Sequence, residues 1–95
     1  MHQRAGQQTF EAVIVGGGPA GLAAAVYLAR FLRSVAVVDA GDARAQLIPR
    51  THNCPGFPEG ISGAELIARL RRQATTYGAE IVRGRVEAVE RGAEI

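Results

Sequence analysis

The chain has 95 residues, 47% of them hydrophobic, with a formal net charge of +2 at pH 7. This length limits it to one domain, no apolar run is long enough to span a membrane, and the scattered arginines lack the aromatic platforms of a nucleic-acid interface. A single cysteine, Cys54, excludes an internal disulfide and a Cys-x-x-Cys redox pair within these residues.

The first half of the chain predicts a strand, a helix and a second strand. Residues 1–9 are polar and lack a signal-peptide core, so we expect a disordered leader on a cytoplasmic protein. The apolar run at 11–16 is typical of a parallel strand covered on both faces. Pro19 suits the first turn of a helix that is expected to continue to about Arg33. The run from Val35 to Asp39 predicts the next strand, joined by a right-handed crossover.

The turn between that strand and helix carries the most informative motif, Gly-Gly-Gly-Pro-Ala-Gly at 16–21. Gly16 allows a tight turn, Gly18 lets the backbone approach a pyrophosphate, and Gly21 lets the helix pack close to the sheet. The helix N-terminus offers free N–H groups to the phosphates. Asp39 follows the second strand, where an acid accepts hydrogen bonds from ribose hydroxyls. The pattern predicts a dinucleotide site. The alternatives are a purely connecting glycine turn and, for the acid, a solvated turn residue.

The second half predicts a long loop and another helix. Residues 40–61 are rich in Gly and Pro and follow neither the helical nor the strand period of apolar residues. A loop of this length is often functional. Ser62 and Glu65 form a capping box, and an apolar stripe at helical spacing follows until Gly78 ends the helix. The three arginines of this helix are interpreted as a solvated face. They are Arg69, Arg71 and Arg72.

Two further strands are expected near the C-terminus, at 79–83 and 85–90. Gly92 then predicts a turn into residues 93–95. The chain therefore stops where a β-hairpin is expected to begin, which suggests a fragment of a longer protein.

The long loop contains a second motif, Thr-His-Asn-Cys-Pro-Gly-Phe-Pro at 51–58, followed by Gly-Ile-Ser-Gly at 60–63. Together with the glycine motif at 16–21, it closely resembles the N-terminal segment of thioredoxin-reductase-like flavoprotein oxidoreductases, class II of the pyridine nucleotide-disulfide oxidoreductases. The resemblance covers residues 10–95 and favours FAD over NAD. It implies an α/β fold: a Rossmann-like, three-layer FAD/NAD(P)-binding fold with a parallel sheet and the start of a β-meander, here incomplete.

The resemblance also implies a set of cofactor contacts. The asparagine of the second motif, Asn53, would hydrogen-bond the isoalloxazine ring, since a carboxamide offers both a donor and an acceptor; the alternative is a turn residue before Pro55. The remaining assignments are Gly16, Gly18, Pro19, Ala20 and Gly21 for the pyrophosphate, Asp39 and Ala40 for the adenosine ribose, Gln46 and Leu47 for the flavin side, and the backbone of Val86 for the adenine.

By this resemblance the whole enzyme would pass electrons from NAD(P)H through FAD to a disulfide or another acceptor, and relatives are often homodimers. The family's NADPH domain and redox Cys-x-x-Cys lie beyond residue 95. Arg44 and Ala45 stand where the family has Gly-Gly, the segment between Gln46 and Asn53 is shorter, and Cys54 replaces an aromatic residue.

Two other functions stay open: a non-catalytic truncated chain and a NAD-binding module. No catalytic residue and no metal ligand is assigned.

Two loop residues have both a chemical and a structural interpretation. Cys54 could be a reactive thiol with a positive neighbour, but a small apolar filler is the preferred interpretation because no resolving cysteine exists here. His52 could transfer protons near a flavin, and a structural or solvated role is preferred for it too.

Overall fold

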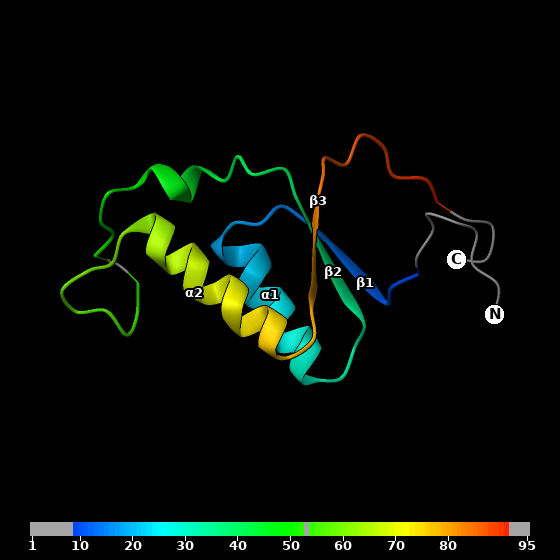
Figure 1. The fold of residues 1–95 in the computed structure, drawn as a ribbon, viewed down its shortest axis with the longest axis horizontal. Helices are drawn as coiled ribbons and strands as arrows, with labels where there is room; N and C mark the ends of the chain where they lie inside the picture. The colour runs from blue at the N-terminus through cyan, green and yellow to red at the C-terminus, as the bar shows by residue number, and fades with distance from the viewer. Residues whose placement is uncertain (1–8, 53, 92–95) are drawn as a thin grey trace.

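The computed structural model describes residues 9–52 and 54–91, which form a three-stranded parallel sheet in the order β1-β2-β3 with its helices on one side (Figure 1). This arrangement confirms the predicted α/β class. The expected leader lies outside the described residues except for Thr9. The elements are β1 (Ala12–Val15), α1 (Pro19–Arg30), β2 (Val35–Asp39), the short 3₁₀ helix η1 (Arg44–Leu47), α2 (Gly63–Thr76) and β3 (Glu80–Arg83).

The core lies between the two α-helices and one face of the sheet. On this face Ile14 of β1 and Ile81 of β3 flank Val37 of the central strand, which is fully buried. Leu22 of α1 and Ile67 of α2 are buried in the same cluster. Small side chains line the inner side of α1, which brings the helix close to the strands. Because all three strands are parallel, their carboxyl ends lie at the same edge of the sheet.

The opposite face of the sheet carries exposed valines. Val13 and Val15 of β1 are 55% and 63% exposed, and Val82 of β3 shares this face in the strand register. The apolar sequence of β1 is thus covered on only one face by the described residues. They provide two of the three layers that the resemblance implies.

Two element boundaries differ from the sequence prediction. Helix α1 ends at Arg30, not near Arg33, because Leu32 adopts a left-handed backbone with φ of 62° and stops the helix. The strand expected at 85–90 does not form, since no other described strand lies beside these residues to provide ladder hydrogen bonds. The expected turn into residues 93–95 lies outside the described residues.

The long loop is more ordered than its composition predicts. It contains η1 and an antiparallel bridge between Thr51 and Ile61. Helix α2 then begins as predicted, with the Ser62 hydroxyl accepting a hydrogen bond from the Glu65 amide at 3.1 Å. The Glu65 carboxylate forms an ion pair with Arg69 at 3.0 Å. This ion pair takes the place of the hydrogen bond from the Ser62 amide that a capping box predicts for the carboxylate.

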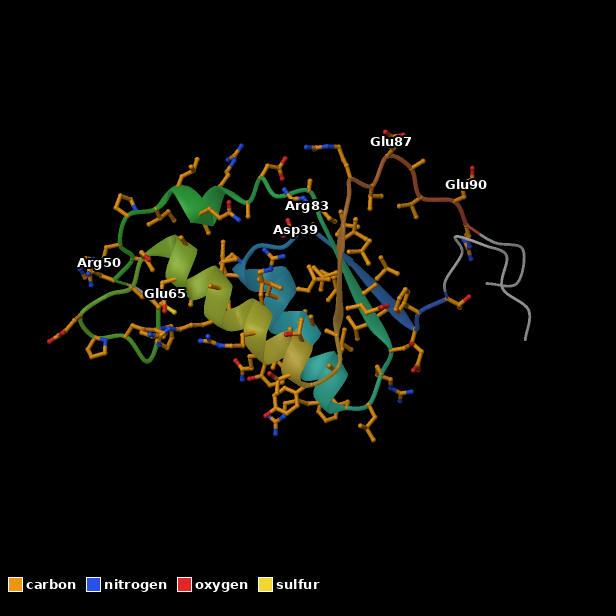
Figure 2. The ribbon with its side chains drawn as sticks, viewed as in Figure 1. Asp39, Arg50, Glu65, Arg83, Glu87 and Glu90 are labelled. Carbon is orange, nitrogen blue, oxygen red and sulfur yellow. The ribbon has the colours of Figure 1, made fainter. Side chains whose placement is uncertain are left out.

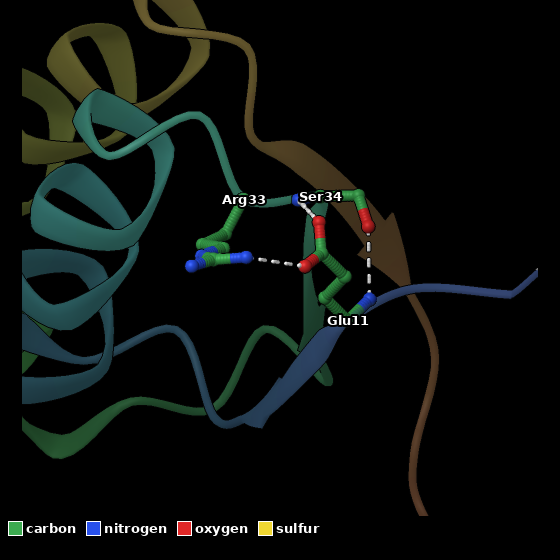
Figure 3. Close-up of polar contacts among 3 residues, drawn as sticks. All are labelled: Glu11, Arg33 and Ser34. Atoms are coloured by element: carbon green, nitrogen blue, oxygen red, sulfur yellow. Dashed lines mark hydrogen bonds and ion pairs between the residues drawn. The ribbon is translucent and has the colours of Figure 1, made fainter.

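A polar clamp ties the start of β1 to the segment before β2 (Figure 3). The Glu11 carboxylate accepts hydrogen bonds from the Ser34 amide at 3.1 Å and from the Arg33 guanidinium at 3.0 Å. The Glu11 amide in turn donates to the Ser34 hydroxyl at 2.8 Å. The backbone donor of Ser34, and after it Arg33, lowers the pKa of the Glu11 carboxyl below its ordinary value of 4.5.

We expect the clamp to make stability depend on pH in the acid range. A carboxyl whose pKa is lowered by folding stabilises the protein above its unfolded pKa, and this contribution disappears as the pH falls through the folded value. Glu11→Gln should therefore lower the urea midpoint at neutral pH and flatten its decline below pH 4.5. Glu87→Gln is the control, because Glu87 has no hydrogen bond or ion pair with the described residues. Equal pH profiles for Glu11→Gln and the unmodified chain would contradict the prediction.

Candidate functional site

The glycine motif forms the turn between β1 and α1, with the geometry its residues predict. Gly16 has φ of 104° and donates its amide to the Val38 carbonyl at 2.9 Å. A Cβ on Gly21 would lie 2.5 Å from the Gly16 carbonyl oxygen, so only glycine lets α1 pack this closely. Gly18 caps α1 without a side-chain hydrogen bond, and a Cβ there would meet no atom within 4 Å. Open space therefore lies above the helix N-terminus, where Pro19 begins the helix.

Gly17 has a role that the sequence did not suggest. A Cβ at this position would lie 2.5 Å from Cγ of Asp39, so the carboxylate occupies the space beside the turn. A third consecutive glycine was the signal that could have pointed to this close approach. The turn and the acid at the end of β2 thus form one compact unit.

Asp39 is a nearly buried acid, with 5% of its surface exposed. One carboxylate oxygen accepts a hydrogen bond from the Gly41 amide at 2.8 Å. The other lies 3.7 Å from the guanidinium of Arg71 on α2. The interpretation of Asp39 as a solvated turn residue is therefore wrong. The Arg71 side chain is 43% exposed, as expected for a solvated face, and it also reaches the sheet edge.

A cavity of about 240 Å³ opens beside Asp39, and we call it the Asp39 pocket. It brings together two residues that the sequence assigned to cofactor contacts, Asp39 and Gln46, although they lie on different elements. It also includes two arginines that the sequence did not assign. The lining residues are Asp39, Gly41, Gln46, Arg71, Ile81 and Arg83.

A second hollow, of about 160 Å³, lies at the carboxyl ends of the strands. Gly16, Ala40 and Val86 all line it, so residues expected at the pyrophosphate, the ribose and the adenine meet at one edge. An ion pair between Arg85 and Asp42, 2.9 Å long, borders this hollow and ties the segment after β3 to the loop after β2.

The flavin-side residues lie farther along the loop. Gln46 and Leu47 belong to η1 and face α2 across a third hollow of about 380 Å³. Leu47 is 83% exposed, so no described residue covers its side chain. Asn53 lies outside the described residues. Cys54 is half-buried, with its thiol 3.8 Å from the Pro55 carbonyl, and His52 is exposed.

Comparison with known proteins identifies the family. Residues 10–94 match the family described as pyridine nucleotide-disulphide oxidoreductase. The chain belongs to this family. The chain is 39% identical over 85 residues to thioredoxin reductase from Aquifex aeolicus, an alignment that covers 87% of this chain and 26% of that protein. With thioredoxin reductase from Streptomyces coelicolor it shares 42% identity over 86 residues, covering 87% and 27% of the two chains.

Solved structures give the same result for the fold. A thioredoxin reductase from Gloeobacter violaceus superposes with a TM-score of 0.77 at 35% identity, covering 81% of this chain and 25% of that one. The thioredoxin reductase from Lactococcus lactis superposes with a TM-score of 0.82 at 29% identity, covering 90% of this chain and 28% of that one. The resemblance to thioredoxin-reductase-like proteins is therefore confirmed, and the chain spans about a quarter of the length of these relatives. No helix among its described residues is long and apolar enough to cross a membrane.

Proposed function

We propose that this segment binds the ADP half of FAD in an oxidoreductase that passes electrons from NAD(P)H through FAD to a disulfide or another acceptor. The observation that carries the proposal is the open space at Gly18, above the N-terminus of α1, beside a helix that Gly21 holds against the sheet. Unpaired N–H groups and the positive end of the helix dipole favour a phosphate there.

The proposed contacts follow the strand ends. The pyrophosphate would lie on the turn from Gly16 to Gly21, including Pro19 and Ala20, and the adenosine ribose would reach Asp39 and Ala40. The adenine would lie beside the backbone of Val86. Bound FAD would accept a hydride from NAD(P)H, whereas the residues of this chain bind and orient the cofactor.

Several finer assignments remain predictions. Gln46, Leu47 and Asn53 would contact the flavin side, and the family suggests a homodimer. The cytoplasmic location, the electron acceptor and the use of NADPH likewise rest on the resemblance.

A titration of the purified chain with FAD tests the proposal. We expect a saturable change in flavin fluorescence that ADP reverses by competition, because the proposed contacts would hold the ADP half. FMN, which lacks the adenosine, should neither bind comparably nor displace FAD. Absorption spectra taken after adding FAD and desalting would show whether the complex survives. A folded chain that does not bind FAD, or that binds FMN equally well, would contradict the assignment.

A further inference from the structure

Helix α2 carries an arginine between two of its buried residues. Ile67 and Ala74 belong to the core, and Arg71 lies four residues after the first and three before the second, spacings that share one helix face. A long charged side chain at such a position packs its stem along apolar surface and extends its head beyond it. The guanidinium of Arg71 accordingly reaches the sheet edge, 3.7 Å from the Asp39 carboxylate. The packing of α2 therefore brings a positive charge to this acid.

The Asp39 carboxylate is confined from three directions. Gly17 leaves room for it, since a Cβ there would lie 2.5 Å from Cγ of Asp39. The Gly41 amide donates to Oδ1 at 2.8 Å, and Arg71 faces Oδ2. Arg83, the register partner of Asp39, lies beside it at the same edge (Figure 2), but no ion pair joins these two residues within the described part of the chain. Arg71 is thus the charged partner that the structure gives to this acid.

The length of this ion pair determines what Arg71 can do. At 3.7 Å it is too long for a hydrogen bond, so Arg71 stabilises the negative charge without occupying Oδ2 as an acceptor. A nearly buried carboxylate needs this compensation, because a buried charge without a partner is costly. Among the described residues no donor forms a hydrogen bond to Oδ2. This oxygen can therefore accept one from a hydroxyl group in the Asp39 pocket.

We propose that Arg71 is a positioning residue for the adenosine ribose: it keeps the Asp39 carboxylate charged and oriented so that Oδ2 accepts a hydrogen bond from a ribose hydroxyl. This inference rests on the proposed function, because it assumes that the ribose lies at Asp39. It goes beyond that function by giving α2, which supplies none of the proposed cofactor contacts, control over how strongly the ribose hydroxyls are recognised.

The test compares ADP with 2′,3′-dideoxy-ADP, which lacks both ribose hydroxyls. Both are titrated calorimetrically into the chain, and FAD is titrated separately. We expect the unmodified chain to bind ADP at least about tenfold more tightly than the dideoxy compound, because a hydrogen bond to a charged group is worth this much. Arg71→Gln should lose most of this preference, and Arg71→Lys, which keeps the positive charge, should restore it. Arg72→Gln removes the same charge from an exposed position on α2 and should preserve the preference.

A double-mutant cycle shows whether Arg71 acts through Asp39. The preference is a ratio of two affinities within one variant, so a lower folded fraction does not change it. Asp39→Asn removes the charge that Arg71 stabilises, and adding Arg71→Gln to it should leave the ADP affinity unchanged. A further loss of ADP affinity in the double variant, as large as the loss that Arg71→Gln causes alone, would show that Arg71 contacts the nucleotide directly and would overturn the positioning role.

The outcomes separate this inference from the proposed function. If FAD and ADP bind but Arg71→Gln keeps the full preference, or if the unmodified chain shows no preference, the positioning role is wrong and the FAD assignment stands. If the preference depends on Arg71 and FAD does not bind, the positioning role stands and the FAD assignment falls. Failure of FAD and ADP alike to bind the folded chain would overturn both.

Discussion

Replacing Gly63 by alanine is expected to destabilise the fold more than any other single-methyl change considered for this chain. A Cβ at Gly63 would lie 1.6 Å from the carbonyl oxygen of Ala45, which is backbone and cannot rotate away. The Gly63 amide also donates to the Ile48 carbonyl at 2.9 Å, so η1 and the start of α2 are held at close range. We expect a loss of about 1–3 kcal/mol, typical of overpacking, measured by urea denaturation.

Gly84→Ala is the matched control for this substitution. A Cβ at Gly84 would find its nearest neighbour, Val38 Cγ1, at 4.0 Å, which is ordinary contact. Its effect should stay within about 0.5 kcal/mol. Unfolding midpoints that agree between Gly63→Ala and the unmodified chain would show that η1 does not lie against α2 as described.

The same substitution is expected to weaken nucleotide binding. Gln46 belongs to η1 and lines the Asp39 pocket, whereas Arg71 reaches that pocket from α2. Forcing η1 away from Gly63 would therefore separate groups that the pocket brings together. A Gly63→Ala protein that is destabilised but binds FAD normally would show that η1 contributes stability only.

Features determined by neighbouring residues could be predicted from the sequence. The apolar run from Val35 to Asp39 forms β2 with the predicted bounds, because a central parallel strand is buried along nearly all its length. Gly16, Gly21 and Gly78 have the roles expected of them, since positive φ and close packing depend on backbone geometry within a few residues. The Ser62 cap was predictable for the same reason.

Features that depend on distant residues could not be predicted in this way. Arg71 lies on a helix whose charged side looks solvated in sequence, and only the packing of α2 beside β2 brings it to Asp39. Gly17 and Arg83 both lie close to Asp39 in the fold, although neither is near it in the sequence. Their importance therefore cannot be seen from neighbouring residues. The strand expected at 85–90 shows the converse limit, because a local sequence cannot form a strand without a pairing partner.

Gly18→Glu is expected to abolish FAD binding and leave the fold intact. The new side chain would extend into open space, since no atom lies within 4 Å of its Cβ. Helix α1 has no acidic residue in its first turn, so a carboxylate there would interact favourably with the helix dipole, by about 0.3–1 kcal/mol. The same carboxylate would occupy the phosphate position and repel the pyrophosphate. We expect FAD affinity to fall at least about a hundredfold, or about 2.7 kcal/mol, with an unchanged or higher urea midpoint.

Two further variants separate the causes of this loss. Gly18→Gln fills the same space without charge and should weaken binding less than glutamate, because it obstructs the pyrophosphate without repelling it. Gln73→Glu adds the same charge at an exposed position on α2 and should bind FAD normally. If Gly18→Glu keeps its FAD affinity while Gln73→Glu behaves as expected, the pyrophosphate does not lie on this turn. Loss of stability together with binding in Gly18→Glu would instead mean that the space above α1 is needed by the fold itself.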